Sequence, residues 1–185
     1  MATPPDFSSG AVLTAAQMDS VGLWLVASGS LSGATTNFQG CFTSDFRNYR
    51  IVISQISFSG AGDMYFRFLS GATPNTTANY FWALRGLTST SVSADNGAGS
   101  QTLYYSGASA VGATSANASV IADIYSPNLS ANTLITSSAI SLATTFNARQ
   151  GGGALNVTTA YDGIQILTST AVTLLGNVTI YGQRD

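Results

Sequence analysis

The chain has 185 residues, enough for one domain, and its 45% apolar residues exclude an intrinsically disordered protein. Charged residues make up only 8%, and all of them are arginine or aspartate, since lysine, glutamate and histidine do not occur. These absences exclude a Ser-His-Asp triad, a zinc site with imidazole ligands and a lysine nucleophile. The net charge is -2 and no basic stripe exists, so we expect no nucleic-acid partner.

The N-terminal residues 1–22 form a predicted docking segment. They lack the basic start and continuous apolar core of a signal peptide, and the longest apolar run, 21–27, is too short to cross a bilayer, so we expect no membrane partner. Thr14 can cap a short helix over 13–21, which Gly22 can end. The apolar side chains of this region must pack on a neighbouring subunit, on a larger particle or back on the chain itself. They are Phe7, Val12, Leu13, Met18, Leu23 and Trp24.

The remaining residues, 23–185, alternate apolar and polar positions between turns rich in Gly, Ser, Asn and Asp, which predicts one domain of short strands. In the segment 49–58 this alternation places Ile53 and Ile56 on opposite faces, and the following SGAGD turn predicts a hairpin with 64–69. The predicted strands are 23–27, 39–42, 49–58, 64–69, 77–84, 101–105, 119–125, 133–142, 163–168, 172–175 and 177–181.

Because no helices separate these strands, parallel crossovers are excluded and the sheets should be antiparallel. We expect an all-β, jelly-roll-like β-sandwich, with another Greek-key sandwich as the alternative. Two segments rich in small polar residues, 88–100 and 106–118, are predicted to be flexible loops. Segment 149–153, which contains three consecutive glycines, is predicted to make a tight turn.

The sequence predicts no catalytic or metal centre. Only Asp123 lies within a predicted strand, where it should face solvent or pair with an arginine. No calcium-binding loop occurs, and the single cysteine, Cys41, is expected to be a buried apolar residue. We therefore expect neither enzymatic activity nor a cofactor. Apart from the C-terminal residue, the other aspartates occupy predicted turns or caps: Asp6, Asp19, Asp45, Asp63, Asp95 and Asp162.

One group of aromatic residues could stack on the apolar face of a sugar while hydroxyls and amides bind its polar edge. The alternative role of these side chains is to fill the core. They are Tyr80, Trp82, Tyr104 and Tyr105.

Three stretches of the chain resemble small structural proteins of tailed bacteriophages, in particular phages of aquatic bacteria, which serve as fibre, appendage, tail or capsid-decoration proteins. The stretches are PPDFSSGAVLTAAQMDSVGLWLV, CFTSDFRNYRIVISQISFSGAGDMYFRFL and YDGIQILTSTAVTLLGNVTIYGQRD. The most specific parts are F-x-x-G-x-x-L-T-A-A-x-M-[DN] near the start and D-G-I-x-I, followed by a strand ending in Y-G, near the end. The link between the last strands is less rich in glycine than is usual in the family.

The resemblance implies a virion protein with a jelly-roll-like sandwich that assembles as a homotrimer and docks on other virion proteins through its N-terminal segment. Such a protein would be made in the cytoplasm of the host bacterium. The alternative function is a receptor-binding tip that recognises a polysaccharide of the host surface, and a glycan depolymerase is a third, weaker hypothesis.

Overall fold

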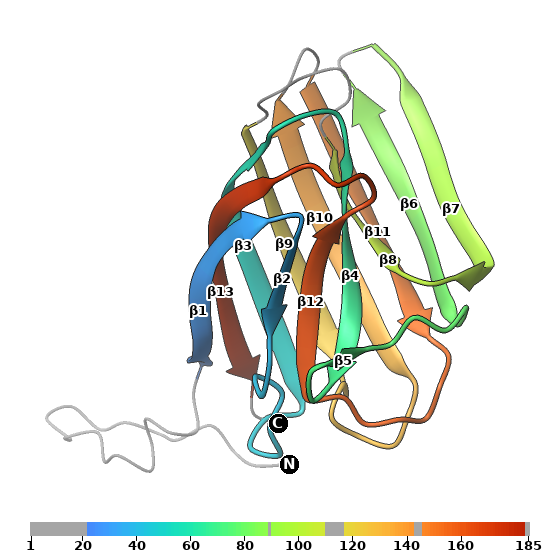
Figure 1. Ribbon diagram of the computed structural model, residues 1–185. Coiled ribbons are helices and arrows are strands. Elements are labelled where there is room, and N and C mark those ends of the chain that lie inside the picture. Colours follow the sequence, from blue (N-terminus) through green and yellow to red (C-terminus); the bar gives the residue numbers. More distant parts are fainter. Residues whose placement is uncertain (1–21, 89, 110–116, 143–145, 184–185) are drawn as a thin grey trace, which may run out of the picture.

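The computed structural model describes residues 22–88, 90–109, 117–142 and 146–183. These residues contain thirteen strands and no helix (Figure 1). The strands are β1 (Leu23–Gly33), β2 (Thr35–Phe38), β3 (Asn48–Phe58), β4 (Asp63–Ser70), β5 (Thr73–Pro74), β6 (Tyr80–Thr88), β7 (Val92–Gln101), β8 (Tyr104–Ser109), β9 (Asn117–Tyr125), β10 (Thr133–Leu142), β11 (Phe146–Leu155), β12 (Gly163–Thr168) and β13 (Leu174–Gln183).

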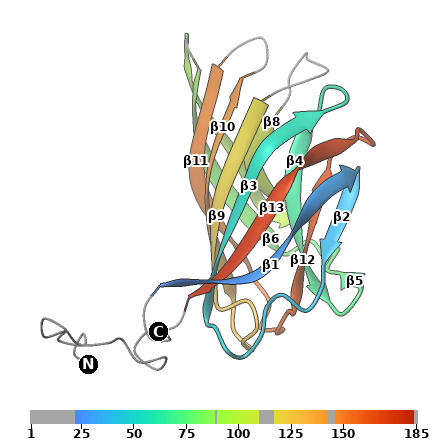
Figure 2. The ribbon, with the colours of Figure 1, turned by 90° about the vertical axis from the view of Figure 1, so that its left-hand side faces the viewer.

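The strands form two antiparallel sheets of unequal size. The large sheet has eight strands in the order β1-β13-β3-β9-β10-β11-β6-β7. The small sheet has the order β2-β12-β4-β5, and β8 pairs with β4 beside them. Figure 2 shows the two layers from the side, with β9, β10 and β11 in one layer and β2, β12 and β4 in the other. The predicted antiparallel β-sandwich is therefore confirmed.

Side chains that point between the two sheets form the core. In β10 the burial alternates at every residue, so that Ile135 and Ala139 face the small sheet while Leu134 and Ile140 face outward. The small sheet contributes Phe66 and other apolar side chains from its own inner face. Burying the apolar surface of one face of each sheet is the main stabilising contribution in such a sandwich.

The predicted alternation in β3 fails at one point because the strand contains a bulge. Gln55 has a positive φ of 54°, and the pairing register of β3 with β9 shifts between Ile53 and Ile56. The extra residue turns Ile56 and Phe58 back to the inner face, where both are buried. The expectation that Ile53 and Ile56 lie on opposite faces is therefore wrong.

The predicted hairpin between 49–58 and 64–69 is also wrong. β3 lies in the large sheet, between β13 and β9, whereas β4 lies in the small sheet, between β12 and β8. The turn after Phe58 therefore carries the chain from one sheet to the other. Both sheets need apolar inner faces, so the two strands look alike in sequence whether they are neighbours in one sheet or face one another across the core.

Three further segments expected to be irregular lie wholly or mostly in strands. The glycine-rich segment 149–153 lies inside β11, which pairs with β10 on one side and β6 on the other. Most of 88–100, including the DNG sequence at Asp95, belongs to β7, and the segment 106–109 belongs to β8. In addition, 174–175 and 177–181 are parts of the single strand β13, which 172 and 173 precede, and 39–42 is not a strand.

Glycine in β11 permits an unusually close approach of neighbouring backbone. A Cβ atom at Gly153 would lie 2.0 Å from the carbonyl oxygen of Phe81, and one at Gly151 would lie 2.1 Å from that of Ala83. Real Cβ atoms do not approach backbone so closely, so only glycine fits at these two positions. The absence of side chains also leaves room over β11 for the ring of Tyr104.

The predicted helix over 13–21 and the predicted docking residues Phe7, Val12, Leu13 and Met18 lie outside the described residues. Leu23 and Trp24 begin β1, an edge strand of the large sheet, where Leu23 is exposed and Trp24 is partly buried. Cys41 is buried and unpaired as expected, and its burial raises the pKa of the thiol to about 12. The described residues contain no helix that could span a membrane.

Candidate functional sites

The large sheet is wider than the small one, and the excess width leaves a groove. Strands β6 and β7 extend past the small sheet, as the right-hand side of Figure 1 shows, so their inner face is covered only in part by β8. A hollow of about 410 Å³ lies there. We call it the β7 groove, and it is lined by Asp63, Tyr65, Trp82, Ala94, Asp95, Asn96, Tyr105, Ser109 and Arg149.

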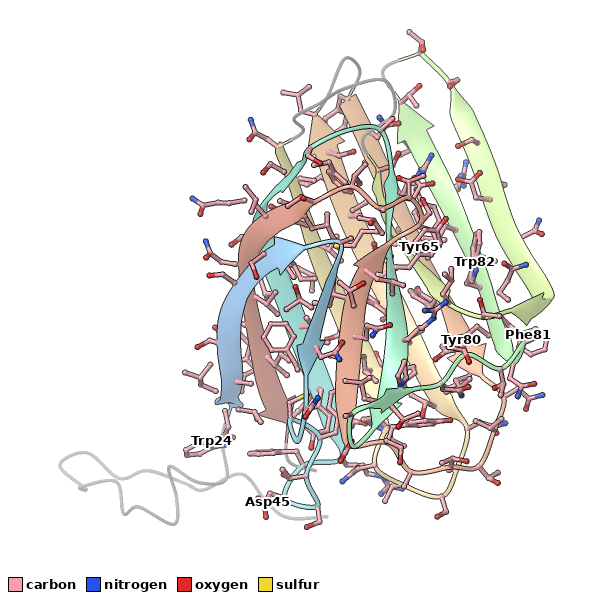
Figure 3. All side chains as sticks on the ribbon, in the orientation of Figure 1. Trp24, Asp45, Tyr65, Tyr80, Phe81 and Trp82 are labelled. Carbon is pink, nitrogen blue, oxygen red and sulfur yellow. The ribbon has the colours of Figure 1, made fainter. Side chains whose placement is uncertain are left out.

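Aromatic rings from three strands meet in the β7 groove. Tyr105 of β8 lies between the other two, with its ring centre 5.4 Å from that of Trp82 on β6 and 5.3 Å from that of Tyr65 on β4. Figure 3 shows the labelled Trp82 and Tyr65 on the same side of the molecule. Gly97 on β7 allows the indole to lie flat against the sheet, since a Cβ atom there would be 2.4 Å from Trp82 Nε1.

Charged groups are positioned around these rings. The guanidinium of Arg149 lies 5.3 Å from the ring centre of Tyr105 and forms an ion pair with Asp95 across 3.6 Å. On the opposite wall, the hydroxyl of Tyr105 donates a hydrogen bond of 3.3 Å to Asp63. Burial and the charge of Asp63 raise the pKa of Tyr65 to about 12, so its hydroxyl stays protonated at alkaline pH values at which an exposed tyrosine ionises.

Three polar atoms at the β7 groove are buried and have no hydrogen-bond partner among the described residues. They are Nε1 of Trp82, Oγ of Ser109 and Oδ2 of Asp95, the last of which has only the ion pair with Arg149 at 3.6 Å. Ser109 is only 3% exposed. Most buried polar groups in proteins have a partner, so a concentration of unsatisfied groups at one hollow is unusual and indicates a place where a ligand could supply the missing hydrogen bonds.

The structure divides the four aromatic residues predicted to contact a glycan into two pairs. Trp82 and Tyr105 meet in the β7 groove. Tyr80 and Tyr104, by contrast, are 0% exposed and belong to the core, so the expected glycan contact is wrong at these two positions. Their hydroxyls are used internally: Tyr80 donates to the carbonyl of Asn75, and Tyr104 shares a hydrogen bond of 2.8 Å with Ser137.

Sequence analysis missed Asp95, Arg149, Ser109 and Tyr65. Asp95 and Arg149 are far apart in the chain and lie in two segments that were predicted to be turns, so nothing in the sequence paired them. The alternation of Ser93, Asp95 and Gly97 on one side of 92–97 is the single local signal that could have predicted a strand there, with the carboxylate on its inner face.

The opposite side of the large sheet is an exposed apolar surface. In this surface, which we call the outer face, the described residues of β9, β10, β11, β6 and β7 carry only two charged side chains, Asp123 and Arg85. Asp123 pairs with Arg50 of β3 through a bond of 2.7 Å, as was expected for this residue. The exposed large apolar residues of the outer face are Phe81, Leu87, Val92, Ile121, Tyr125, Leu134, Ile140, Leu142 and Phe146.

Strand pairing places these apolar side chains in continuous rows. Tyr125 is directly opposite Leu134, which is opposite Ala154, and Ala154 is opposite Phe81. A second hollow of about 380 Å³ opens beside this row, over the glycines of β11. Leu134 is 52% exposed. A patch of this extent is rare on a monomeric protein and usually marks an interface.

The described residues contain no group of three or more cysteine or aspartate side chains that could hold a metal ion. Comparison with known proteins adds no assignment, because no family model, no curated protein and no solved structure matches this chain. The features that bear on function are the two surfaces of the large sheet and the resemblance seen in the sequence.

Proposed function

We propose that this protein is a non-enzymatic structural subunit of a bacteriophage particle, a fibre, appendage or decoration protein that assembles as a homotrimer through the outer face. The apolar outer face is the observation that carries this proposal, because a sandwich already has a complete core between its sheets and gains nothing for its own fold from exposed leucine, isoleucine and phenylalanine. The resemblance to structural proteins of tailed phages supports two further parts of the proposal, the location in a virion and the trimeric state.

The dimensions of the outer face suit a subunit interface. Five strands about 4.8 Å apart, each about ten residues long at about 3.3 Å per residue, cover about 24 by 33 Å, or about 800 Å². Stable protein interfaces bury about 800 Å² on each partner. The outer face is also nearly free of charge, as the centres of such interfaces are.

Analytical ultracentrifugation of the purified chain tests the assembly. We expect a species with three times the 19.0 kDa mass of one chain. Ile140 is 52% exposed on β10 in the outer face, so Ile140→Asp should yield folded monomers. Thr35→Asp, on the edge strand β2 of the small sheet, is the control and should leave the trimer intact. A wild-type chain that sediments as a monomer at micromolar concentration contradicts the proposal.

The virion assignment needs a separate experiment. A cryo-EM map of the intact particle should contain density for groups of three sandwiches of this shape. Deleting the residues before Ser20 should give folded protein that no longer joins the particle, because the docking segment is lost while strands β1 to β13 remain. Incorporation of the truncated chain at normal copy number contradicts the docking role. The alternative role in host recognition is favoured by one observation, the β7 groove.

A further inference from the structure

We infer that the β7 groove is a binding site for a neutral saccharide of one or two hexopyranose units. The inference concerns the inner face of β6 and β7 and does not depend on trimer assembly, which uses the opposite face of the same strands. Its hollow of about 410 Å³ lies in the range of small-ligand sites in proteins, roughly 300 to 1,000 Å³.

The unsatisfied polar atoms indicate a ligand with both donors and acceptors. Trp82 Nε1 can only donate, and the Ser109 hydroxyl can both donate and accept. The carboxylate oxygen Oδ2 of Asp95 accepts, and its ion-pair partner Arg149, 3.6 Å away, leaves it without a hydrogen bond. Sugar hydroxyls also donate and accept, so one polyhydroxylated ligand could satisfy all three groups. An apolar ligand would leave them unpaired in a drier environment, which costs free energy.

The aromatic rings indicate that the ligand also has an apolar surface. Trp82 and Tyr65 line the β7 groove on either side of Tyr105, and Trp82 is partly exposed. The carbon-bound hydrogens of a pyranose ring form flat apolar patches that pack on aromatic faces, while the hydroxyls at the ring edge remain free for hydrogen bonds. Asp63 also lines the groove, where its carboxylate can accept hydrogen bonds from those hydroxyls.

The charges of the β7 groove favour a neutral ligand. A cation would prefer the aromatic face of Tyr105 beside Asp95, but the guanidinium of Arg149 already occupies this place. An anion would meet the carboxylates of Asp63 and Asp95, while the one arginine is already paired. A neutral sugar avoids both conflicts and can form charge-assisted hydrogen bonds to the carboxylates.

The experiment measures binding of the full chain to a glycan array that includes neutral, acidic and amino sugars. Titration calorimetry with the disaccharides maltose, cellobiose and lactose, and with the best neutral oligosaccharide from the array, then gives the affinity. Two variants test the site: Trp82→Ala removes the aromatic surface, and Asp95→Asn removes the charged acceptor with little change in shape. Each should weaken binding about tenfold or more, the effect of losing one good charge-assisted or aromatic contact.

Two matched variants on the outer face serve as controls. Phe81→Ala removes the aromatic residue next to Trp82 on the opposite side of β6, and Asp123→Asn removes the other aspartate of the large sheet that is paired with an arginine. Both should bind the saccharide like the wild type. Circular dichroism melting shows whether the Trp82→Ala variant remains folded. If that variant unfolds, the Asp95→Asn variant still tests the site.

The inference is overturned if no neutral saccharide on the array binds, if acidic or amino sugars bind in preference to neutral ones, or if Asp95→Asn binds as tightly as the wild type. These outcomes leave the trimer proposal unaffected, because that proposal is tested by sedimentation. Conversely, a monomeric wild-type chain that binds a neutral saccharide at this groove contradicts the assembly and supports the site.

Discussion

On strand β6, Phe81 and Trp82 are consecutive, and their side chains lie on opposite faces of the large sheet. Phe81 belongs to the outer face, a broad, flat surface with almost no charge. Trp82 belongs to the β7 groove, a small concave site where aromatic rings are surrounded by two carboxylates and one guanidinium. A flat apolar surface of this size suits another protein, whereas a concave site with orphaned polar atoms suits a small polar ligand.

One sheet carries two different surfaces because the side-chain period of a strand is two residues. Neighbouring positions can therefore change independently as long as the backbone stays in register. The glycines of β11 are the exception to this independence, because a side chain at Gly151 or Gly153 would collide with the backbone of β6. This difference leads to the following tests, beginning with the largest effect.

The strongest test compares neighbouring glycines of β11. Gly153→Ala should lower the free energy of unfolding by about 3 kcal/mol or more, because the new Cβ would lie 2.0 Å from the carbonyl oxygen of Phe81 and 2.9 Å from the ring of Tyr104. Gly152→Ala faces outward, with its nearest neighbour at 3.0 Å, and should cost far less. Urea denaturation measures both. Equal losses for the two variants would show that the inner side of β11 is not constrained as described.

The second test uses alkaline pH to probe the buried side of the large sheet. Burial raises the pKa of Tyr104 from its usual value of 10.0 to about 12. Above pH 10 the unfolded chain releases this proton while the folded chain retains it, so the contribution of Tyr104 to stability is fully present below pH 10 and about 2 to 3 kcal/mol of it is lost by pH 12. Tyr104→Phe should reduce this loss in denaturation curves measured at several pH values. An unchanged pH dependence in the variant contradicts the assigned burial of the hydroxyl.

The third test compares substitutions on the two faces of β6. Phe81→Ala should weaken trimer association about tenfold and leave saccharide affinity unchanged, whereas Trp82→Ala should weaken saccharide binding about tenfold and leave association unchanged. Sedimentation and calorimetry on the same two variants measure both properties. If either variant changes both properties equally, the faces are coupled and the division between them is wrong.

The smallest effect is expected for the ion pair of the outer face. Arg50 Nε and Asp123 Oδ1 are 2.7 Å apart, but both side chains are substantially exposed, at 44% and 29%. Exposed pairs contribute about 0.2 to 1 kcal/mol, and salt screens them. Asp123→Asn should therefore lower stability by no more than this amount, with a smaller difference in 1 M NaCl. A loss of several kcal/mol in thermal denaturation would indicate that the pair is buried in an interface.

Sequence patterns predicted strands correctly where an alternating run was bounded by turn residues. The limits of β10 and β12 were predicted to the residue, and β9 was predicted within two residues of its start. The prediction failed in β7 and β11, whose glycine, serine and asparagine content is typical of turns. In these strands the neighbouring backbone, and not local preference, keeps the chain extended, because strand pairing supplies hydrogen bonds that the isolated segment cannot form.

The candidate site was predicted only in part for the same reason. The sequence indicated that aromatic residues near positions 80–82 and 104–105 are important, but it could not distinguish those in the core from those at the surface. The two strands carrying Asp95 and Arg149 had been predicted to be turns, so their pairing with one another and with Tyr105 could not be anticipated.

The sequence by itself determined the fold class and the range of possible chemistry. Alternation without helical periodicity requires antiparallel sheets, and the lack of histidine, lysine and glutamate removes most catalytic groups. Only the tertiary structure decided which strands share a sheet, where the bulge of β3 restores its inner face, and which rings remain accessible. Side-chain alternation is a local property of each strand, whereas sheet membership and exposure depend on contacts between residues distant in the chain.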